Sequence, residues 1–284
     1  MERLKELMLY GRQSMNEGEH GRAILYYQNA LKHASVNSLQ THSLILEECY
    51  EQIAISFKEL GNIKESLSFY QTYLALCISR TGKNHIHLAE AYVKLGDFHK
   101  HICEFETSVD YYKMAREIFE DKYGENSKEC CNCLVKEGDL FYKEELYELA
   151  SMRLLKVLET LRITHQKSTI LSSNVHFKLG LTYMKMENFP LAITFFKQCY
   201  EIRLRTVGNL EETADALEQL ALAHSGQYEY NQCLGFLQKA LTIYQKFQKQ
   251  QKIFNCKYQI SNTLKKMKEI YEDKYEQSIP LYNY

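Results

Sequence analysis

The sequence has few residues that interrupt a helix and no segment long enough to cross a membrane. Among 284 residues there are two prolines, at 190 and 280, twelve glycines and no tryptophan. Because proline and glycine disfavour helix interiors, their scarcity favours helices over strands. No stretch approaches the roughly 18 consecutive apolar residues of a membrane span. We therefore expect an all-helical chain without membrane insertion.

The charges favour neither sign. Lys and Arg number 35 against 36 for Asp and Glu, a formal net charge of -1, so no overall field would attract nucleic acid or an anionic membrane. The nine cysteines are scattered and odd in number, which disfavours a disulfide framework. The first six residues carry interleaved charges instead of an apolar targeting segment. We therefore expect a soluble, cytoplasmic protein.

Motifs for catalysis and metal binding are missing. The sequence has no P-loop, no dinucleotide-binding glycine fingerprint, no Gly-x-Ser-x-Gly and no His-Glu-x-x-His. Cys130, Cys131 and Cys133 form the densest group of thiols, but adjacent positions on a helix point to different faces and no second pair matches them. We predict no enzymatic activity, no cofactor and no metal site.

Glycines recur with a fixed spacing. Gly96, Gly138 and Gly180 are each 42 residues apart, and a second series at 82, 124 and 208 shows differences of 42 and 84. Two series with one period predict a structural repeat of 42 residues.

The residues around these glycines resemble the tetratricopeptide repeat. The most complete copy carries the marker residues His176, Leu179, Gly180, Tyr183, Ala192, Phe196 and Cys199. Matching residues occur in five further copies, so the resemblance covers roughly residues 3–247. It implies an all-α, right-handed superhelical solenoid of about six helix-turn-helix repeats, whose stacked first helices line a concave trough.

We expect one domain over residues 1–275. The predicted repeats lie near 3–40, 43–82, 86–124, 127–166, 169–208 and 210–247. Their first helices are predicted near 3–17, 43–60, 86–101, 127–144, 169–186 and 210–225. Apolar residues at three- and four-residue spacing predict a capping helix over 252–273, and residues 276–284 are expected to form a flexible tail.

The 42-residue period is longer than the usual repeat of about 34 residues and resembles the kinesin light chain type. Residues 82–85, Gly-Lys-Asn-His, are similar to the Gly-x-x-His linker of that type, with Ile86 in place of the expected proline. Gly124 and Gly208 keep the glycine, where a left-handed residue can close the preceding helix.

Several cysteines and histidines are predicted to have structural roles. Cys199 and Cys233 occupy positions where helices cross closely and alanine is usual, so they are predicted to be packing residues. His99 and His224 occupy aromatic positions and are predicted to be buried. The linker pair at 85 and 87 is predicted to cap a helix and to face solvent.

The trough should be lined by the residue two positions before each marker, which is Leu9, Gln52, Lys94, Lys136, Lys178 and Gln219. The resemblance to kinesin light chain implies asparagine there. Lysine at three of these positions would favour acidic side chains or a carboxylate. With their neighbours, the candidate partner-binding residues are Gln52, Lys94, Asn132, Lys136, Lys143, Asn174, Phe177, Lys178, Leu181, Lys185 and Gln219.

The lysines differ in their neighbours on the same helix. Lys94 has acidic residues four positions before it and three after it, which allows pairing within the helix, whereas Lys178 has none on its own face. This favours an apolar trough with a basic edge in repeats four and five. The alternative is a row of solvated lysines that keeps the solenoid soluble.

These observations predict a non-catalytic adaptor or scaffold that binds an extended, partly acidic segment of a protein partner in the concave trough. The alternative is a structural subunit of a cytoskeletal, ciliary or transport assembly, which would contact its neighbours through the convex face or the ends of the solenoid.

Overall fold

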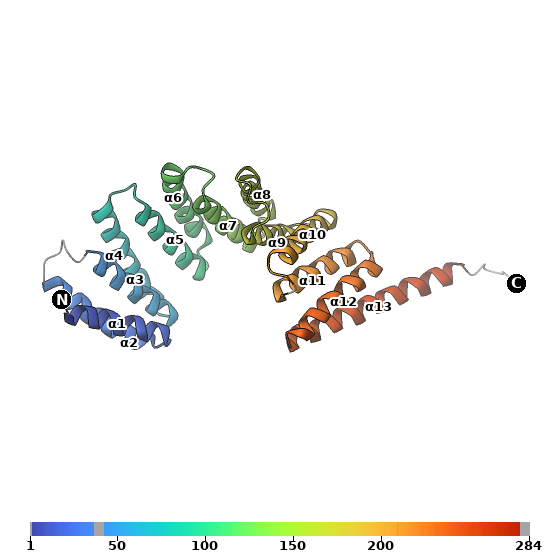
Figure 1. Cartoon of the computed structure of the whole chain (residues 1–284), viewed down its shortest axis with the longest axis horizontal. Coiled ribbons are helices and arrows are strands. Elements are labelled where there is room, and N and C mark those ends of the chain that lie inside the picture. The colour runs from blue at the N-terminus through green and yellow to red at the C-terminus, as the bar shows by residue number, and fades with distance from the viewer. Residues whose placement is uncertain (1, 37–42, 209, 279–284) are drawn as a thin grey trace. The chain divides into compact units, whose positions relative to one another are not determined.

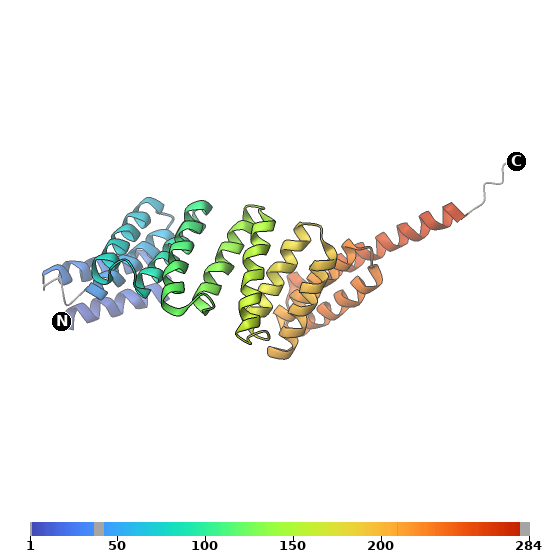
Figure 2. The same cartoon turned by 90° about the horizontal axis from the view of Figure 1, so that it is seen from above.

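The chain is built from helices. The computed structural model describes residues 2–36, 43–208 and 210–278, and within these ranges it contains thirteen α-helices and no strand (Figures 1 and 2). The chain divides into two compact units, Met1–Cys133 and Leu134–Tyr284, and the boundary falls inside one helix, α7. The predicted all-α class is confirmed.

The first unit contains α1 (Glu2–Asn16), α2 (His20–Val36), α3 (Ser43–Glu59), α4 (Ile63–Thr81), α5 (Ile86–His101), α6 (Phe105–Tyr123) and the start of α7 (Lys128–Lys143). The second contains the rest of α7, α8 (Tyr147–Ile163), α9 (Ile170–Lys185), α10 (Phe189–Thr206), α11 (Glu211–Gly226), α12 (Tyr230–Lys246) and α13 (Gln250–Ser278). Odd-numbered helices from α1 to α11 are the first helices of the six pairs. They begin and end within one residue of the predicted bounds.

Left-handed residues end the helices of each pair. After the first helices, φ is positive at Gly18, Gly61, Cys103, Glu145, Glu187 and Tyr228. At one of these turns the Glu104 N–H donates to the His99 carbonyl (2.9 Å), which satisfies a carbonyl left open at the helix end. Gly82, Gly124 and Gly208 follow second helices with φ of 78°, 85° and 76°, as the second glycine series predicts.

Two rows of second-helix residues fill the space between paired helices. One row consists of large residues that are at most 4% exposed: Tyr27, Tyr70, Tyr112, Leu154, Phe196 and Leu237. The other row consists of small residues that are fully buried: Ala23, Ser66, Ser108, Ala150, Ala192 and Cys233. The hydroxyls of Ser66 and Ser108 each donate to a carbonyl of the preceding first helix at 2.7 Å, so equivalent positions make equivalent contacts in successive repeats.

Helix α13 packs on α12 and is tied to α11 by polar contacts. Cys256 and Thr263 on α13 are buried and lie against α12. Lys252 forms an ion pair with Asp215 (2.6 Å), and the Gln259 amide donates to Glu218 (2.8 Å). This helix extends further than the predicted 252–273. It includes residues 276–278 of the predicted tail, and residues 279–284 lie outside the described residues.

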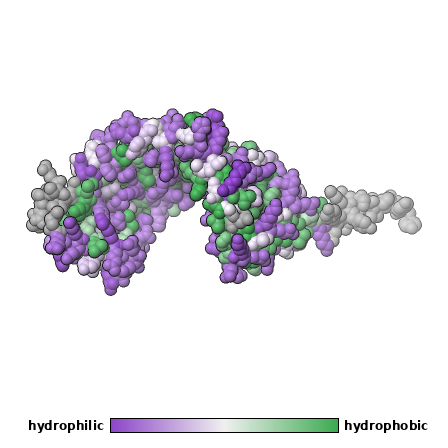
Figure 3. Space-filling view, in the orientation of Figure 1, coloured by the Kyte–Doolittle hydropathy of each residue, from purple (hydrophilic) through white to green (hydrophobic). Residues whose placement is uncertain are grey.

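Hydrophilic residues dominate the visible surface, with apolar residues between them (Figure 3). None of the helices, within the residues described, is both long and apolar enough to cross a membrane.

Candidate partner-binding surface

All eleven candidate residues reach the protein surface. Gln52, Lys94, Lys136, Phe177, Lys178, Leu181 and Gln219 are half-buried, whereas Asn132, Lys143, Asn174 and Lys185 are exposed. Gln52, Lys94 and Asn132 belong to the first unit, and the other eight belong to the second. In each unit they lie on first helices, so each unit carries its own part of the predicted surface, here called the first-helix face.

In the first unit, Lys94 pairs with a neighbouring helix instead of its own. Its Nζ lies 2.8 Å from the Glu51 carboxylate on α3 and 5.5 Å from the ring centroid of Tyr73. The acidic residues considered from the sequence have other contacts: Glu90 lies against His87, and Asp97 accepts from the Tyr112 hydroxyl. Lys94 therefore does not make the pairing that the spacing allows within its helix, because the adjacent first helix brings Glu51 close to it.

In the second unit, Lys178 has an acidic partner that its own helix does not supply. Its Nζ lies 2.5 Å from Oδ1 of Asp139 on α7, and both side chains are about one-third exposed or less. The sequence places no acidic residue on the face of α9 that carries Lys178, and the competing carboxylate comes from the neighbouring helix instead. The first-helix face thus neutralises part of its own positive charge, which weakens the argument for an acidic partner at this lysine.

Arg203, on the second helix α10, organises two of the candidate residues. Its guanidinium donates to Asn174 Oδ1 (3.2 Å) and to the Glu212 carbonyl (2.5 Å), and it lies 4.8 Å from the centroid of the Phe177 ring. Arg203 itself is only 8% exposed. It therefore fixes Asn174 and Phe177 from inside the helix packing, with little of its own surface open to solvent. Sequence reasoning missed Arg203, although the equivalent positions in the other repeats carry no charge: Ala34, Cys77, Phe119, Leu161 and Tyr244.

Around this arginine the face combines apolar and polar groups. Phe177 and Leu181 pack partly against the buried Phe196 cluster. Lys185 lies one turn further along α9, is exposed, and forms no ion pair with any described residue. Gln219 is half-buried on the next first helix, α11. The second unit therefore presents amide groups, apolar side chains and a cation on one face.

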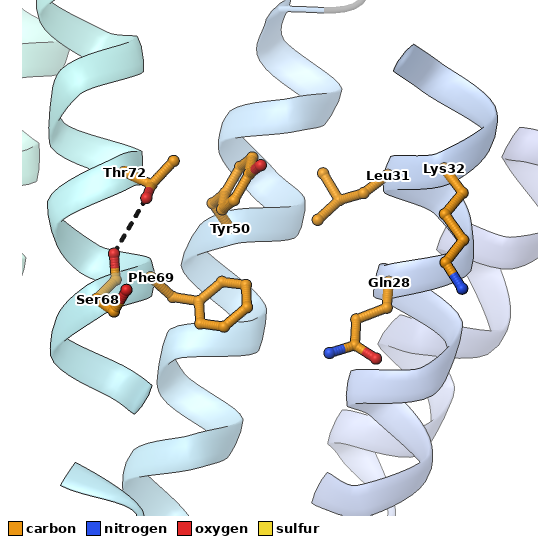
Figure 4. Close-up of a pocket in the computed structure, with 7 residues that line it drawn as sticks. All are labelled: Gln28, Leu31, Lys32, Tyr50, Ser68, Phe69 and Thr72. Carbon is orange, nitrogen blue, oxygen red and sulfur yellow. Dashed lines mark hydrogen bonds between the residues drawn. The ribbon is translucent and has the colours of Figure 1, made fainter. Parts of the chain in front are cut away.

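A pocket on the second-helix side of the first unit was not predicted. It has a volume of about 480 Å³ and is lined by Gln28, Leu31, Lys32, Tyr50, Ser68, Phe69 and Thr72 (Figure 4). Residues of α2 and α4 form its two sides, and Tyr50 of α3 lies between them. The Thr72 hydroxyl donates to the Ser68 carbonyl (3.1 Å), so it stays within its own helix. The lining thus combines the apolar side chains of Leu31 and Phe69 with polar groups.

The second unit has a pocket that partly overlaps the equivalent position. It has a volume of about 360 Å³ and is lined by Leu158, Leu161, Arg162, Lys167, Ser168, Ser172, His176, Gln198, Glu201, Ile202 and Arg205. His176 and Gln198 follow Tyr50 and Thr72 by three repeat lengths. Burial lowers the pKa of His176, whose Nδ1 lies 2.7 Å from the Ser172 carbonyl, so the neutral ring donates there. The 126-residue spacing between these lining residues, three times the repeat length, is the sequence signal that relates the two pockets.

The cysteines and histidines chosen as structural residues are buried or capping. Cys199 and Cys233 are fully buried, and His99 and His224 are 5% and 7% exposed. His85 caps α5, accepting from the His87 N–H (3.2 Å). Cys130, Cys131 and Cys133 are buried in the helix packing, and in the described part of the chain no group of His, Cys, Asp and Glu is arranged to hold a metal ion.

Thiol labelling should reach one cysteine in the folded chain. Cys103 is exposed and the other eight cysteines are buried. Burial also raises the pKa of Cys77, Cys199 and Cys256 to about 11, which suppresses the reactive thiolate. We expect iodoacetamide at neutral pH to modify Cys103 alone, as read by mass spectrometry, and Cys103→Ser to abolish labelling. Equally fast modification of the 130–133 group would contradict this packing.

The comparisons agree with the repeat pattern. Residues 171–246 match the tetratricopeptide repeat family model. Over 229 residues the chain is 24% identical to protein KINESIN LIGHT CHAIN-RELATED 2 of Arabidopsis thaliana, which covers 78% of this chain. The chain spans about a third (34%) of that relative's length.

Solved structures share the fold. The apo form of RapI superposes with a TM-score of 0.73 at 18% identity, covering 86% of this chain and 65% of RapI. A Podosopora anserina putative kinesin light chain with nearly identical repeats superposes with a TM-score of 0.63 at 13% identity, covering 74% of this chain and all (100%) of the other.

Proposed function

We propose that this chain, a tetratricopeptide repeat protein of the long, kinesin light chain-like type, is a non-catalytic adaptor that binds an extended segment of a protein partner along its first-helix face. The repeat fold supports a role in protein interaction. The relationship to a kinesin light chain-related protein supports a cytoplasmic site of action with a cytoskeletal association.

The observation that carries the proposal is the arrangement around Arg203 in the second unit. A side chain that is almost completely buried holds Asn174 by a hydrogen bond and Phe177 by a cation–π contact. Groups fixed in this way lose little conformational entropy on binding. The amide of Asn174 can bond the backbone of an extended segment while Phe177 and Leu181 contact its apolar side chains.

The charge pattern refines the expected partner. Lys178 is already paired with Asp139, whereas Lys185 forms no ion pair among the described residues. We therefore propose a segment with apolar side chains over Phe177 and Leu181 and one acidic residue beside Lys185. A strongly acidic segment is less suited, because it would have to displace Asp139.

The test uses side chains that do not pack in the core. Intact protein is used to capture partners from cells, and peptides that tile the captured proteins are then titrated directly against the purified chain. Lys185→Glu combined with Gln219→Ala should weaken binding of the best peptide at least about tenfold. One attractive charge becomes repulsive, and one hydrogen bond of a side-chain amide is lost. The matched control is Lys197→Glu, an exposed lysine on the second helix α10.

Equal affinity of the double variant and the control would contradict binding on the first-helix face. One observation supports the alternative of a structural subunit that contacts its neighbours through second helices: each unit has a pocket between its second helices. In that case Thr72→Arg, which fills the pocket of Figure 4, should remove partners that the double variant retains.

A further inference from the structure

The final helix carries two opposite stripes, and only one is covered. Residues of the covered stripe, Ile253, Cys256, Ile260, Thr263, Met267 and Ile270, are buried or half-buried. The opposite stripe consists of Phe254, Lys257, Tyr258, Ser261, Leu264, Lys265 and Lys268, and every member is exposed. We call it the outer stripe of α13. Its spacing of three and four residues places all seven on one side of the helix.

Large apolar side chains on this stripe are unusual at the end of a repeat stack. Phe254, Tyr258 and Leu264 are 66%, 67% and 51% exposed. A terminal repeat normally turns a polar face to solvent, because no further repeat covers it. Helix α13 also has 29 residues against 17 in α12, and it continues past the end of α12 in Figures 1 and 2. Helix α13 is therefore longer than the helix α12 on which it packs.

The spacing of the outer stripe suits another helix. Positions 254, 257, 258, 261, 264, 265 and 268 follow the three- and four-residue spacing with which one helix face contacts another helix, and three of the seven are large apolar residues. Phe254, Tyr258 and Leu264 share the stripe with Ser261 and the lysines at 257, 265 and 268. Between residues 250 and 270 the helix has five lysines and one acidic residue, Glu269. A partner helix would thus need apolar residues flanked by carboxylates.

The charges argue against two other occupants. A second copy paired through the same stripe would bring lysines such as Lys257 and Lys265 against each other, which is destabilising. Insertion into a membrane surface needs an apolar face separated from the charged one. Here lysines lie between the apolar residues, so inserting Phe254, Tyr258 and Leu264 together would also bury Lys257.

We propose that the outer stripe of α13 binds an acidic amphipathic helix of a protein partner, independently of the first-helix face. The ion pair of Lys265 with Glu269 is long (3.8 Å) and exposed, so it competes weakly with a partner's carboxylate. Carboxylates beside the lysines would set the orientation of the partner helix, and its apolar residues would cover Phe254, Tyr258 and Leu264.

The probe is a synthetic peptide of three heptads with leucine at the core positions and glutamate beside them. Its partner probe has lysine in place of each glutamate. Binding of each labelled peptide to the full chain is measured by fluorescence anisotropy at several salt concentrations. We expect the acidic peptide to bind at least about tenfold more tightly than the basic one, with a preference that declines as salt rises.

Three variants of the full chain decide the assignment. Lys257→Glu with Lys265→Glu, and separately Tyr258→Ser, should each weaken the acidic peptide about tenfold, a change of about 1.4 kcal/mol. The control, Lys64→Glu with Lys197→Glu, changes charge equally at exposed positions on other helices and should bind normally. Unchanged circular dichroism confirms that each variant is folded.

Three results would overturn the proposal. Equal affinity of the α13 variants and the control would show that the peptide binds elsewhere. If the chain bound vesicles of equal amounts of phosphatidylcholine and phosphatidylserine but not the peptide, and the α13 variants lost the vesicle binding, the stripe would be assigned to a membrane. Dimerisation in sedimentation that Tyr258→Ser abolishes would assign it to a second copy.

Discussion

Arg80→Ala is expected to lower the free energy of unfolding of the first unit by about 3 kcal/mol. Arg80 on α4 donates to both carboxylate oxygens of Glu47 on α3, at 2.5 and 2.8 Å. The Glu47 side chain is 8% exposed, so removing its partner leaves a buried carboxylate without compensation. The same hydrogen bonds raise the pKa of Arg80, so its guanidinium stays charged. Urea titration monitored by circular dichroism measures the loss.

Two comparisons separate the buried charge from the loss of a side chain. Arg22→Ala removes an exposed ion pair with Glu19 in the same unit and should cost about 0.5 kcal/mol or less. Replacing both Glu47 and Arg80 by leucine removes the pair together and should recover most of the stability. If Arg80→Ala were no more destabilising than Arg22→Ala, Glu47 would have to reach water in the folded chain.

The sequence predicted the helices well because the repeat imposes the same local constraints six times. Gly82, Gly124 and Gly208 lie at left-handed positions where the second helices end, and the 42-residue period fixed the first helices to within one residue. The length of α13 was less predictable. No glycine or proline interrupts it before Pro280, so periodicity gave no stop signal near residue 273.

The chemistry of the first-helix face was harder to predict because it depends on neighbouring helices. Lys94 and Lys178 were compared with residues on their own helices, whereas the structure pairs them with Glu51 and Asp139 of the preceding first helices. Arg203 lies on a second helix and reaches the face through the packing. Such contacts follow from the crossing of helices, which a single-helix spacing rule does not describe.

The glycine markers give the second large prediction. Gly180→Ala is expected to lower the free energy of unfolding of the second unit by about 2 kcal/mol, although alanine is the better helix former. A methyl group at Gly180 would lie 2.5 Å from the ring of Phe196. Three atoms of this buried, rigid ring would lie within 2.8 Å of the methyl group, so relief needs a larger shift than a few tenths of an ångström. Calorimetry on the full chain measures the change.

Repeat four supplies the matched control, because its glycine faces a smaller neighbour. A methyl group at Gly138 would lie 3.1 Å from Cγ of Leu154, a contact that a small shift relieves, so Gly138→Ala should be nearly neutral. Gly180→Ala combined with Phe196→Leu copies that pairing and should recover part of the loss. Equal effects of Gly180→Ala and Gly138→Ala would contradict the close approach. The expected difference would show that ring size at this crossing decides where the marker must be glycine.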